Sequence, residues 1–139
     1  MANRFTMTFT AEARHIDEMG HVNNGVWVNW MEAIATAHWQ HDGDPAHVAK
    51  YAWVVTRHEI DYRGNVRLGD TVTALTEILE GPTGARFDRH FTFTDSKGKA
   101  LVRARTTWAM VDRGTGRVMR VPAEVSAPFL APQEVPREA

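Results

Sequence analysis

The sequence predicts an α+β domain in which a curved antiparallel sheet wraps around one long buried helix. A single apolar segment of helical period follows the first strand, and four long strand-like segments come after it. Turn residues separate these four segments at hairpin spacing, so most of the sheet should be antiparallel.

The first strand and the helix are read from a change of period. Residues 5–11 alternate between apolar side chains and threonines, as in a half-buried strand. From about Asn24 the period becomes 3.6, and Gly43 and Pro45 are the stop signals. The expected apolar stripe of this helix contains Val26, Trp27, Trp30, Met31, Ala33, Ile34 and Ala37.

The remaining chain reads as strands up to its last turn of helix. The four long segments cover residues 51–64, 70–80, 85–95 and 100–112. A short strand at 117–121 and a helical turn at 122–126 follow. One helix covers only part of such a sheet, and its edge strands need protection. Edge-to-edge pairing with a second copy supplies that protection, so we expect a homodimer or a dimer of dimers.

Composition limits the function classes. The chain has 139 residues, 43% of them hydrophobic and 24% charged, which suits one soluble domain over 1–139. We expect the proline-rich, charged residues from about 129 to 139 to form a flexible tail. A formal net charge of −1 argues against nucleic-acid or anionic-membrane binding.

Two features that the sequence lacks limit the possible chemistry and the expected location of the protein. The chain has no cysteine, which excludes disulfides, thiolate metal sites and a cysteine nucleophile. It also has no apolar run of membrane-spanning length and no signal-like N-terminus. A cytoplasmic protein is therefore expected.

The segment before the helix concentrates polar residues in a short loop, namely Asp17, Gly20, His21, Asn23 and Asn24. A structural explanation is available for each of three features: an asparagine N-cap, a glycine turn and an aspartate that bonds its own backbone. A functional explanation uses the same physics. The first turn of a buried helix offers unpaired N–H groups that can stabilise the oxyanion formed from an ester or thioester carbonyl. Asp17 would then act as nucleophile or as the base for a water.

The whole motif "DEMGHVNNGVWVNWME" resembles that of the hotdog-fold acyl-CoA thioesterases of the 4-hydroxybenzoyl-CoA thioesterase type. The segments "HEIDYRGNVRLGD" and "WAMVDRGTGRVMRVP" are similar to later strands of that family, so the resemblance runs from about residue 5 to 128. It implies a hotdog fold with a five-stranded antiparallel sheet around the helix. It further implies a dimer across residues 52–64, active sites at the subunit interface, an acyl-CoA substrate, and neither metal nor cofactor.

By position in this motif, Asp17 matches the catalytic carboxylate of the family. Asn24 falls where the backbone N–H at the helix start polarises the thioester carbonyl, and Gly20 matches the turn glycine. His21 and Asn23 match positions that shape the loop and are candidates to touch substrate.

Candidate pocket residues are bulky side chains of the helix and the facing strand. Trp27, Trp30, Met31 and Trp53 fit this description, with a role in the core as the alternative for each. Glu32, about two turns along the helix from Asn24, is a candidate for the interface site, with an exposed or ion-paired acid as the alternative.

Three groups of charged residues have simple structural explanations. The segment 38–47 holds His38, His41, Asp42, Asp44 and His47, but its spacing lacks a regular third metal ligand, so a solvated helix end is expected. Glu59 and Asp61 are expected to pair with Arg57 or Arg63 across strands. The C-terminal half carries arginines that suit either a coenzyme A phosphate end or ordinary surface: Arg86, Arg89, Arg103, Arg105, Arg113, Arg117 and Arg120.

Hydrolysis of an acyl-CoA thioester is thus the function that the sequence favours. Two alternatives remain open. One is an acyl-thioester hydratase or dehydratase on the same fold, which would use a paired histidine and acid. The other is a non-catalytic dimer that binds acyl thioesters, against which the presence of Asp17 argues.

Overall fold

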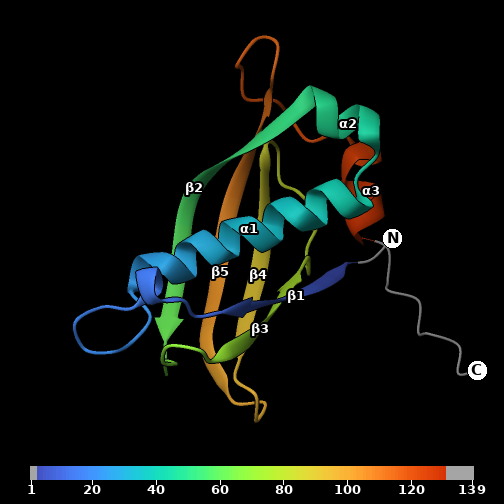
Figure 1. The fold of residues 1–139 in the computed structure, drawn as a ribbon. Helices are drawn as coiled ribbons and strands as arrows, with labels where there is room; N and C mark the ends of the chain where they lie inside the picture. Colours follow the sequence, from blue (N-terminus) through green and yellow to red (C-terminus); the bar gives the residue numbers. More distant parts are fainter. Residues whose placement is uncertain (1–2, 131–139) are drawn as a thin grey trace, which may run out of the picture.

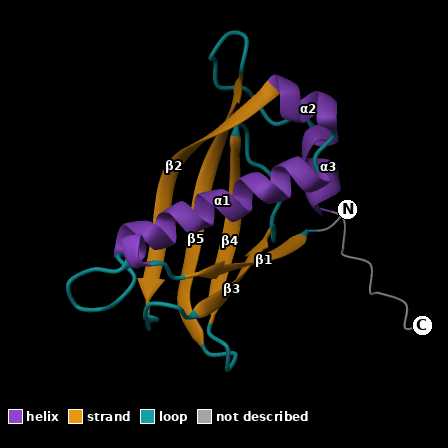
Figure 2. Ribbon diagram, viewed as in Figure 1, coloured by secondary structure: helices purple, strands orange, loops and turns teal. Residues whose placement is uncertain are grey.

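The computed structural model describes residues 3–130, which form one sheet and three α-helices (Figures 1 and 2). The strands are β1 (Arg4–Thr10), β2 (Tyr51–Tyr62), β3 (Thr71–Glu77), β4 (Arg86–Thr94) and β5 (Ala100–Asp112). The helices are α1 (Asn24–Asp42), α2 (Pro45–Lys50) and α3 (Ala123–Leu130), with a 3₁₀ turn at Ala13–His15.

The sheet has the order β1-β3-β4-β5-β2, and every neighbouring pair is antiparallel. It curves around α1, which crosses its concave side (Figure 1). This arrangement is the hotdog fold, so the predicted fold class is confirmed. The five predicted strands are present, and β5 has the predicted bounds. The expected strand at 117–121 is reduced to an isolated bridge between Val111 and Val118.

Helix α1 begins and ends as the sequence predicts. The Asn23 side chain accepts a hydrogen bond from the Gly25 N–H and caps the first turn. At the other end Gly43 follows the helix, where an added Cβ would lie 2.5 Å from the Trp39 carbonyl oxygen. Only glycine fits this close approach of two backbone segments.

The buried face of α1 differs from the predicted stripe by a small rotation. Ala33 is exposed, whereas Val26 and Ala37 are only half-buried. The large indoles of Trp27 and Trp30 set the inward direction, because they bury the most apolar area. The residues that α1 buries are Trp27, Trp30, Met31, Ile34, Ala35, His38 and Trp39.

Two short helices close the end of the fold away from the α1 N-terminus (Figure 2). Helix α2, which the sequence pattern did not predict, is capped by the Asp44 side chain and has Pro45 in its first turn. Helix α3 is longer than the predicted turn and includes Phe129, which is 2% exposed and packs in the core. The part of the expected tail at residues 131–139 lies outside the described residues.

The two edge strands of the sheet differ in length. β1 has 7 residues, whereas β2 has 12 and a bulge between Val55 and Arg57. Val54 and Tyr62 of β2 are exposed, at 44% and 42%. Within residues 3–130, no helix combines the length and the apolar character needed to cross a bilayer.

Candidate active site

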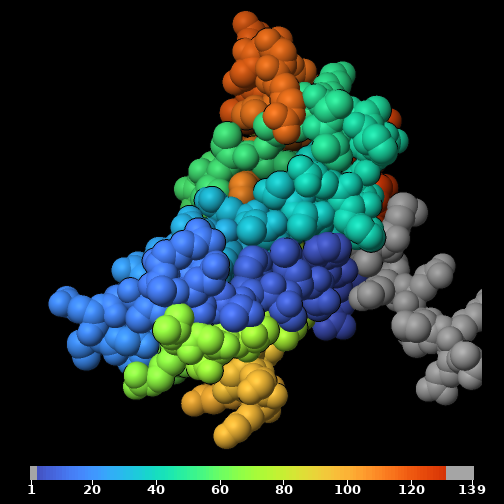
Figure 3. Space-filling model, in the orientation of Figure 1, coloured from blue at the N-terminus to red at the C-terminus, as the bar shows by residue number. Residues whose placement is uncertain are grey.

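The polar loop before α1 is a small hairpin that spans residues 15–23. The Asp17 N–H donates to the His21 carbonyl at 2.8 Å, and the Asn23 N–H donates to the His15 carbonyl at 2.9 Å. Gly20 closes the turn with a φ of +77°, a value that favours glycine. The hairpin projects from the body of the molecule, as the blue segment after β1 shows in Figures 1 and 3.

The Asp17 side chain folds back onto this turn. Its Oδ1 accepts hydrogen bonds from the Met19 N–H at 2.9 Å and the His21 N–H at 3.1 Å. Within residues 3–130, Oδ2 has no hydrogen-bond partner. The carboxylate is half-buried and lies two residue pairs beyond the N-cap, about 7 Å along the hairpin. It is thus held in a fixed direction with one oxygen free.

The start of α1 leaves one backbone donor open. The Asn23 side chain takes the Gly25 N–H, and the Val26 N–H donates to the Asn23 carbonyl at 2.9 Å. Among the described residues, the Asn24 N–H has no partner. The Tyr62 phenol donates to the Asn24 carbonyl at 3.3 Å, which ties the helix start to the end of β2. Burial raises the pKa of Tyr62, so the phenol keeps its proton at neutral pH.

Asn65 fixes the base of the hairpin to the rest of the domain. Its Nδ2 donates to the Val22 carbonyl at 3.1 Å, and its Oδ1 accepts the Val22 N–H at 3.0 Å. Val22 is 1% exposed, so these bonds satisfy both polar backbone groups of a buried residue. This role of Asn65 is not visible in the local sequence, because its partner Val22 is 43 positions away.

The other predicted site residues lie in different surroundings. His21 and Gly20 are half-buried in the hairpin, close to Asp17, whereas Glu32 is exposed on α1. Trp27 has no exposed surface and packs in the core against Trp30 and Phe93, so in this chain it offers no surface to a ligand. Trp27 is therefore a residue of the hydrophobic core and does not line a substrate pocket in this chain.

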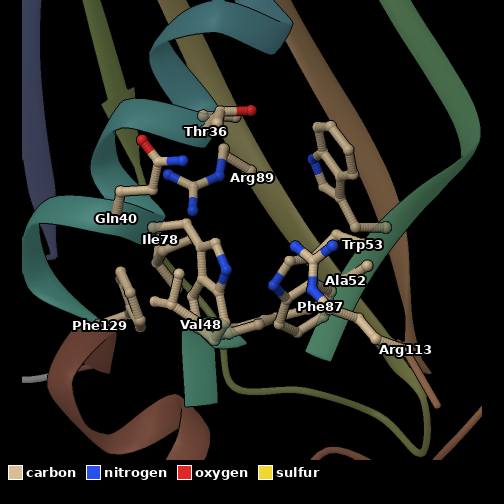
Figure 4. Close-up of a pocket in the computed structure, with 13 residues that line it drawn as sticks. Thr36, Gln40, Val48, Ala52, Trp53, Ile78, Phe87, Arg89, Arg113 and Phe129 are labelled. Atoms are coloured by element: carbon tan, nitrogen blue, oxygen red, sulfur yellow. The ribbon is translucent and has the colours of Figure 1, made fainter. Parts of the chain in front are cut away.

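A pocket of about 180 Å³ lies between the C-terminal half of α1 and strands β2, β4 and β5 (Figure 4). Trp53 lines it, as predicted, but Trp30 and Met31 belong to the core. Its apolar walls come mainly from Trp39, Trp53, Ile78, Phe87, Trp108 and Phe129. The polar lining is Thr36, Gln40, Arg89 and Arg113.

Arg89 is buried beside this pocket, at 8% exposure, which contradicts its expected place among surface arginines. It occupies an inward position of β4 between Phe87 and Phe91, so it takes the place of an apolar residue in the alternation. That break in the alternation is visible in the sequence. Burial lowers the pKa of Arg89 to about 9, so the guanidinium stays protonated at neutral pH.

Arg89 belongs to a buried chain of polar groups. Its Nη1 donates to His38 Nδ1 at 2.6 Å and to Thr76 Oγ1 at 3.2 Å, and His38 Nε2 lies 3.1 Å from Asp42 Oδ2. Because arginine can only donate, His38 Nδ1 accepts and its Nε2–H donates to the carboxylate. The expectation of a solvated helix end is wrong for His38, which is 0% exposed; His41, with a side chain 69% exposed, fits it.

Several of the remaining charged candidates form pairs at the surface. Arg57 contacts Glu59 at 2.6 Å, and Arg63 lies 3.9 Å from Asp61, so each pair is within β2 or just past it instead of across strands. Arg105 Nε donates to Asp88 at 2.9 Å. Within the described part of the chain, no three His, Asp or Glu side chains gather as a metal site.

A family model for the thioesterase-like superfamily matches residues 11–129 of this chain. The match includes the hairpin, α1 and the whole sheet except β1. The chain belongs to the thioesterase-like superfamily. This agrees with the resemblance drawn from the Asp17 motif, while the narrower 4-hydroxybenzoyl-CoA type stays a prediction.

Known relatives of this thioesterase-like chain differ in length. A chloroplast acyl-[acyl-carrier-protein] hydrolase of Cuphea viscosissima is 35% identical over 75 residues, which are 52% of this chain and 18% of that enzyme. An acyl-ACP thioesterase of Bacteroides thetaiotaomicron has a TM-score of 0.80 at 24% identity, over 99% of this chain and 57% of that one. The chain thus spans only part of these two relatives.

A solved structure of similar length also shares the fold. The 1,4-dihydroxy-2-naphthoyl-CoA thioesterase of Synechocystis has a TM-score of 0.76 at 14% identity, over 91% of this chain and 95% of that one. At this identity the similarity establishes the fold of this thioesterase-like chain and not its substrate.

Proposed function

We propose that the protein hydrolyses an acyl-CoA thioester to the free acid and CoA. One observation carries the proposal: a fixed carboxylate, that of Asp17, stands just outside the first turn of a buried helix whose Asn24 N–H is open. The N–H and the helix dipole stabilise negative charge on the carbonyl oxygen as the carbonyl carbon becomes tetrahedral. Membership of the thioesterase-like superfamily supports this chemistry.

Asp17 can take part in hydrolysis by either of two mechanisms. As nucleophile, its free Oδ2 attacks the carbonyl carbon, the C–S bond breaks, CoA leaves as thiolate, and water hydrolyses the resulting anhydride. As base, the carboxylate takes a proton from a water that attacks the same carbon, and the proton passes to the leaving sulfur. Neither route needs a metal or a cofactor. The half-buried His21 next to Asp17 shapes the hairpin in both.

The site is completed by a second copy of the chain. The long β2 edge is open, with Val54 and Tyr62 exposed, and Met19 on the hairpin is 72% exposed. Pairing two β2 strands about a two-fold axis places the end of one strand beside the start of the other. Because Tyr62 is tied to Asn24, the helix start of the second copy then comes beside Trp53, at the pocket.

Thiol release from a panel of acyl-CoAs, with the acid product identified, tests this function. The panel spans acetyl, branched, aromatic and long-chain groups. The proposal predicts equal amounts of thiol and free acid from at least one member. A reversible loss of enoyl absorbance without thiol would indicate a hydratase instead, and saturable binding without any turnover would indicate a binding protein.

A further inference from the structure

The pocket beside Arg89 combines an apolar wall with an unusual buried cation. Arg89 donates both of its hydrogen bonds from Nη1, to His38 and Thr76, and within residues 3–130 its Nε and Nη2 have no hydrogen-bond partner. No carboxylate of the described residues lies within ion-pair distance of it. Figure 4 shows the guanidinium lying among the residues that line the pocket, on the side of Thr36 and Gln40. Neither of these two nitrogens is fully buried without a partner, so both keep access to open space, where an acceptor can reach them.

The charge of the pocket lining has one sign. Two arginines, Arg89 and Arg113, line it, and none of its lining residues is acidic. Arg113 is held at the rim by its bond from Nε to the Tyr51 carbonyl at 3.1 Å. The indole N–H groups of Trp39 and Trp108 are buried behind the pocket wall and have no partner among the described residues, so the accessible donors of the lining are those of the arginines and of Thr36 and Gln40. The surroundings therefore supply donors and positive charge.

We propose that this pocket binds the far end of a compact acyl group that carries a second carboxylate, and that Arg89 selects it. The planar fork of the guanidinium pairs with a carboxylate through two parallel hydrogen bonds, and the low dielectric of the pocket strengthens them. The inference rests on the thioester hydrolysis proposed above, and it names the substrate class of that reaction.

The size of the pocket limits the acyl group. A cavity of about 150 Å³ is enough for a benzene ring. A pocket of about 180 Å³ therefore fits one ring or a chain of roughly six carbons, and is too small to enclose a long fatty acyl chain. The aromatic walls of Trp53, Phe87 and Trp108 suit either shape.

The reaction centre that serves this pocket belongs to the second copy. Along α1 the rise of 1.5 Å per residue places His38, and with it Arg89, roughly 21 Å from Asn24 of the same chain. A compact acyl group does not span that distance. The β2 pairing brings Asn24 of the second copy to Trp53 at the pocket, which leaves a short path from the thioester to Arg89.

His38 and Asp42 act as positioning residues. The imidazole accepts a hydrogen bond from Nη1 of Arg89, and its Nε2–H donates to the Asp42 carboxylate. Linked hydrogen bonds of this kind polarise and strengthen one another. This occupies the Nη1 end of the guanidinium and leaves Nε and Nη2 for a ligand.

Binding of two matched pairs of acyl-CoAs to the full chain carrying Asp17→Asn tests the proposal, since that variant should bind without turnover. The pairs are adipyl- with heptanoyl-CoA, and 4-carboxybenzoyl- with 4-isopropylbenzoyl-CoA. Calorimetry should give the carboxylate member of at least one pair a Kd about tenfold to a hundredfold lower. Adding Arg89→Gln should reduce that ratio to about one. Adding Lys97→Gln, which removes an exposed charge from the turn between β4 and β5, should leave it unchanged.

Equal affinities within both pairs, or a preference that survives Arg89→Gln, would overturn the proposal. If Arg89→Gln does not fold, Arg89→Lys keeps the charge but not the fork and should lower the ratio several-fold, and an unchanged ratio again overturns it. The binding readout is independent of hydrolysis. A preference for the carboxylate member without thiol release from the wild type would overturn only the proposed hydrolase function. Thiol release without such a preference would overturn only the proposed role of Arg89.

Discussion

At the scale of single residues, the turn that contains Asp17 has the same hydrogen-bond pattern as a turn around another aspartate, Asp95. Asp95, between β4 and β5, accepts from the N–H groups of Lys97 and Lys99 through Oδ1, as Asp17 does from Met19 and His21. Those two bonds lower the pKa of Asp95, with the Lys99 N–H as the larger cause. The turn geometry is therefore structural in both places. Of these two aspartates only Asp17 lies near the open end of a buried helix, and for that reason we propose the catalytic role for Asp17.

The Asn24 N–H can be removed without disturbing the helix. Proline is favoured at the first helical position, and Asn23 already has the extended backbone, φ −61° and ψ 142°, that a following proline requires. Asn24→Pro should fold normally and lower kcat about a hundredfold to a thousandfold. Asn24→Ala keeps the N–H and should lose far less. Similar rates of thiol release for the two variants would remove this N–H from the mechanism.

Residue roles that depend on local sequence were predictable, and those that depend on distant partners were not. The Asn23 cap, the Gly20 turn and the Asp17 hydrogen bonds all lie within a few positions of one another. Arg89 is bonded to His38 across 51 positions, so neither was recognised as buried, although the alternation of β4 marks Arg89 as inward.

At the scale of elements, the position of the hairpin at residues 15–23 depends on the two hydrogen bonds between Asn65 and Val22. Asn65→Ala would leave the N–H and C=O of buried Val22 without partners, at a cost of about 1–3 kcal/mol in unfolding free energy. We expect a lower melting temperature, by on the order of 5 °C, together with a lower kcat because the Asp17 hairpin is displaced. Asn29→Ala, on the exposed face of α1, is the control and should change neither. A full rate at reduced stability would show that the hairpin does not need this anchor.

The bounds of the main helices and strands were predictable from the period of the apolar residues and from the turn and capping residues between them. The change from period 2 to period 3.6 located α1, and Asn23 and Gly43 gave its ends. Helix α2 escaped prediction because its 6 residues are too short for a period to emerge, although Asp44 and Pro45 together form a capping signal. The rotation of the α1 face followed from side-chain volume, which the apolar pattern alone does not weigh.

At the scale of the whole molecule, the open β2 edge predicts assembly. In solution the protein should have at least twice the chain mass of 15.7 kDa. Val54→Glu places like charges near each other in the paired edges, so it should give monomers and abolish thiol release with Asp17 intact. Val118→Glu makes the same change at a more exposed valine away from β2, and it should keep both mass and activity. Light scattering measures the mass, and an active monomer of Val54→Glu would contradict the shared site.

The fold as a whole was predictable because its local signals agree with each other. Hairpin turns join β3 to β4 and β4 to β5, whereas β2 and β3 are not neighbours in the sheet despite the turn residues between them. One apolar helix left no other layer for the sheet to cover. The pocket was not predictable, because its walls come from all three α-helices, three strands and the segments just after β3 and β5, and no sequence period links these parts.

The initial rate of thiol release by Asp17→Asn tests directly whether the Asp17 carboxylate is catalytic. The asparagine Oδ1 can still accept from Met19 and His21, so the hairpin should persist while the carboxylate is lost. On the best acyl-CoA, we predict a rate about a thousandfold below that of the wild type. Asp95→Asn, with the same change in the same kind of turn, should retain the full rate. Equal rates for Asp17→Asn and the wild type would contradict the assignment of Asp17 as the catalytic carboxylate.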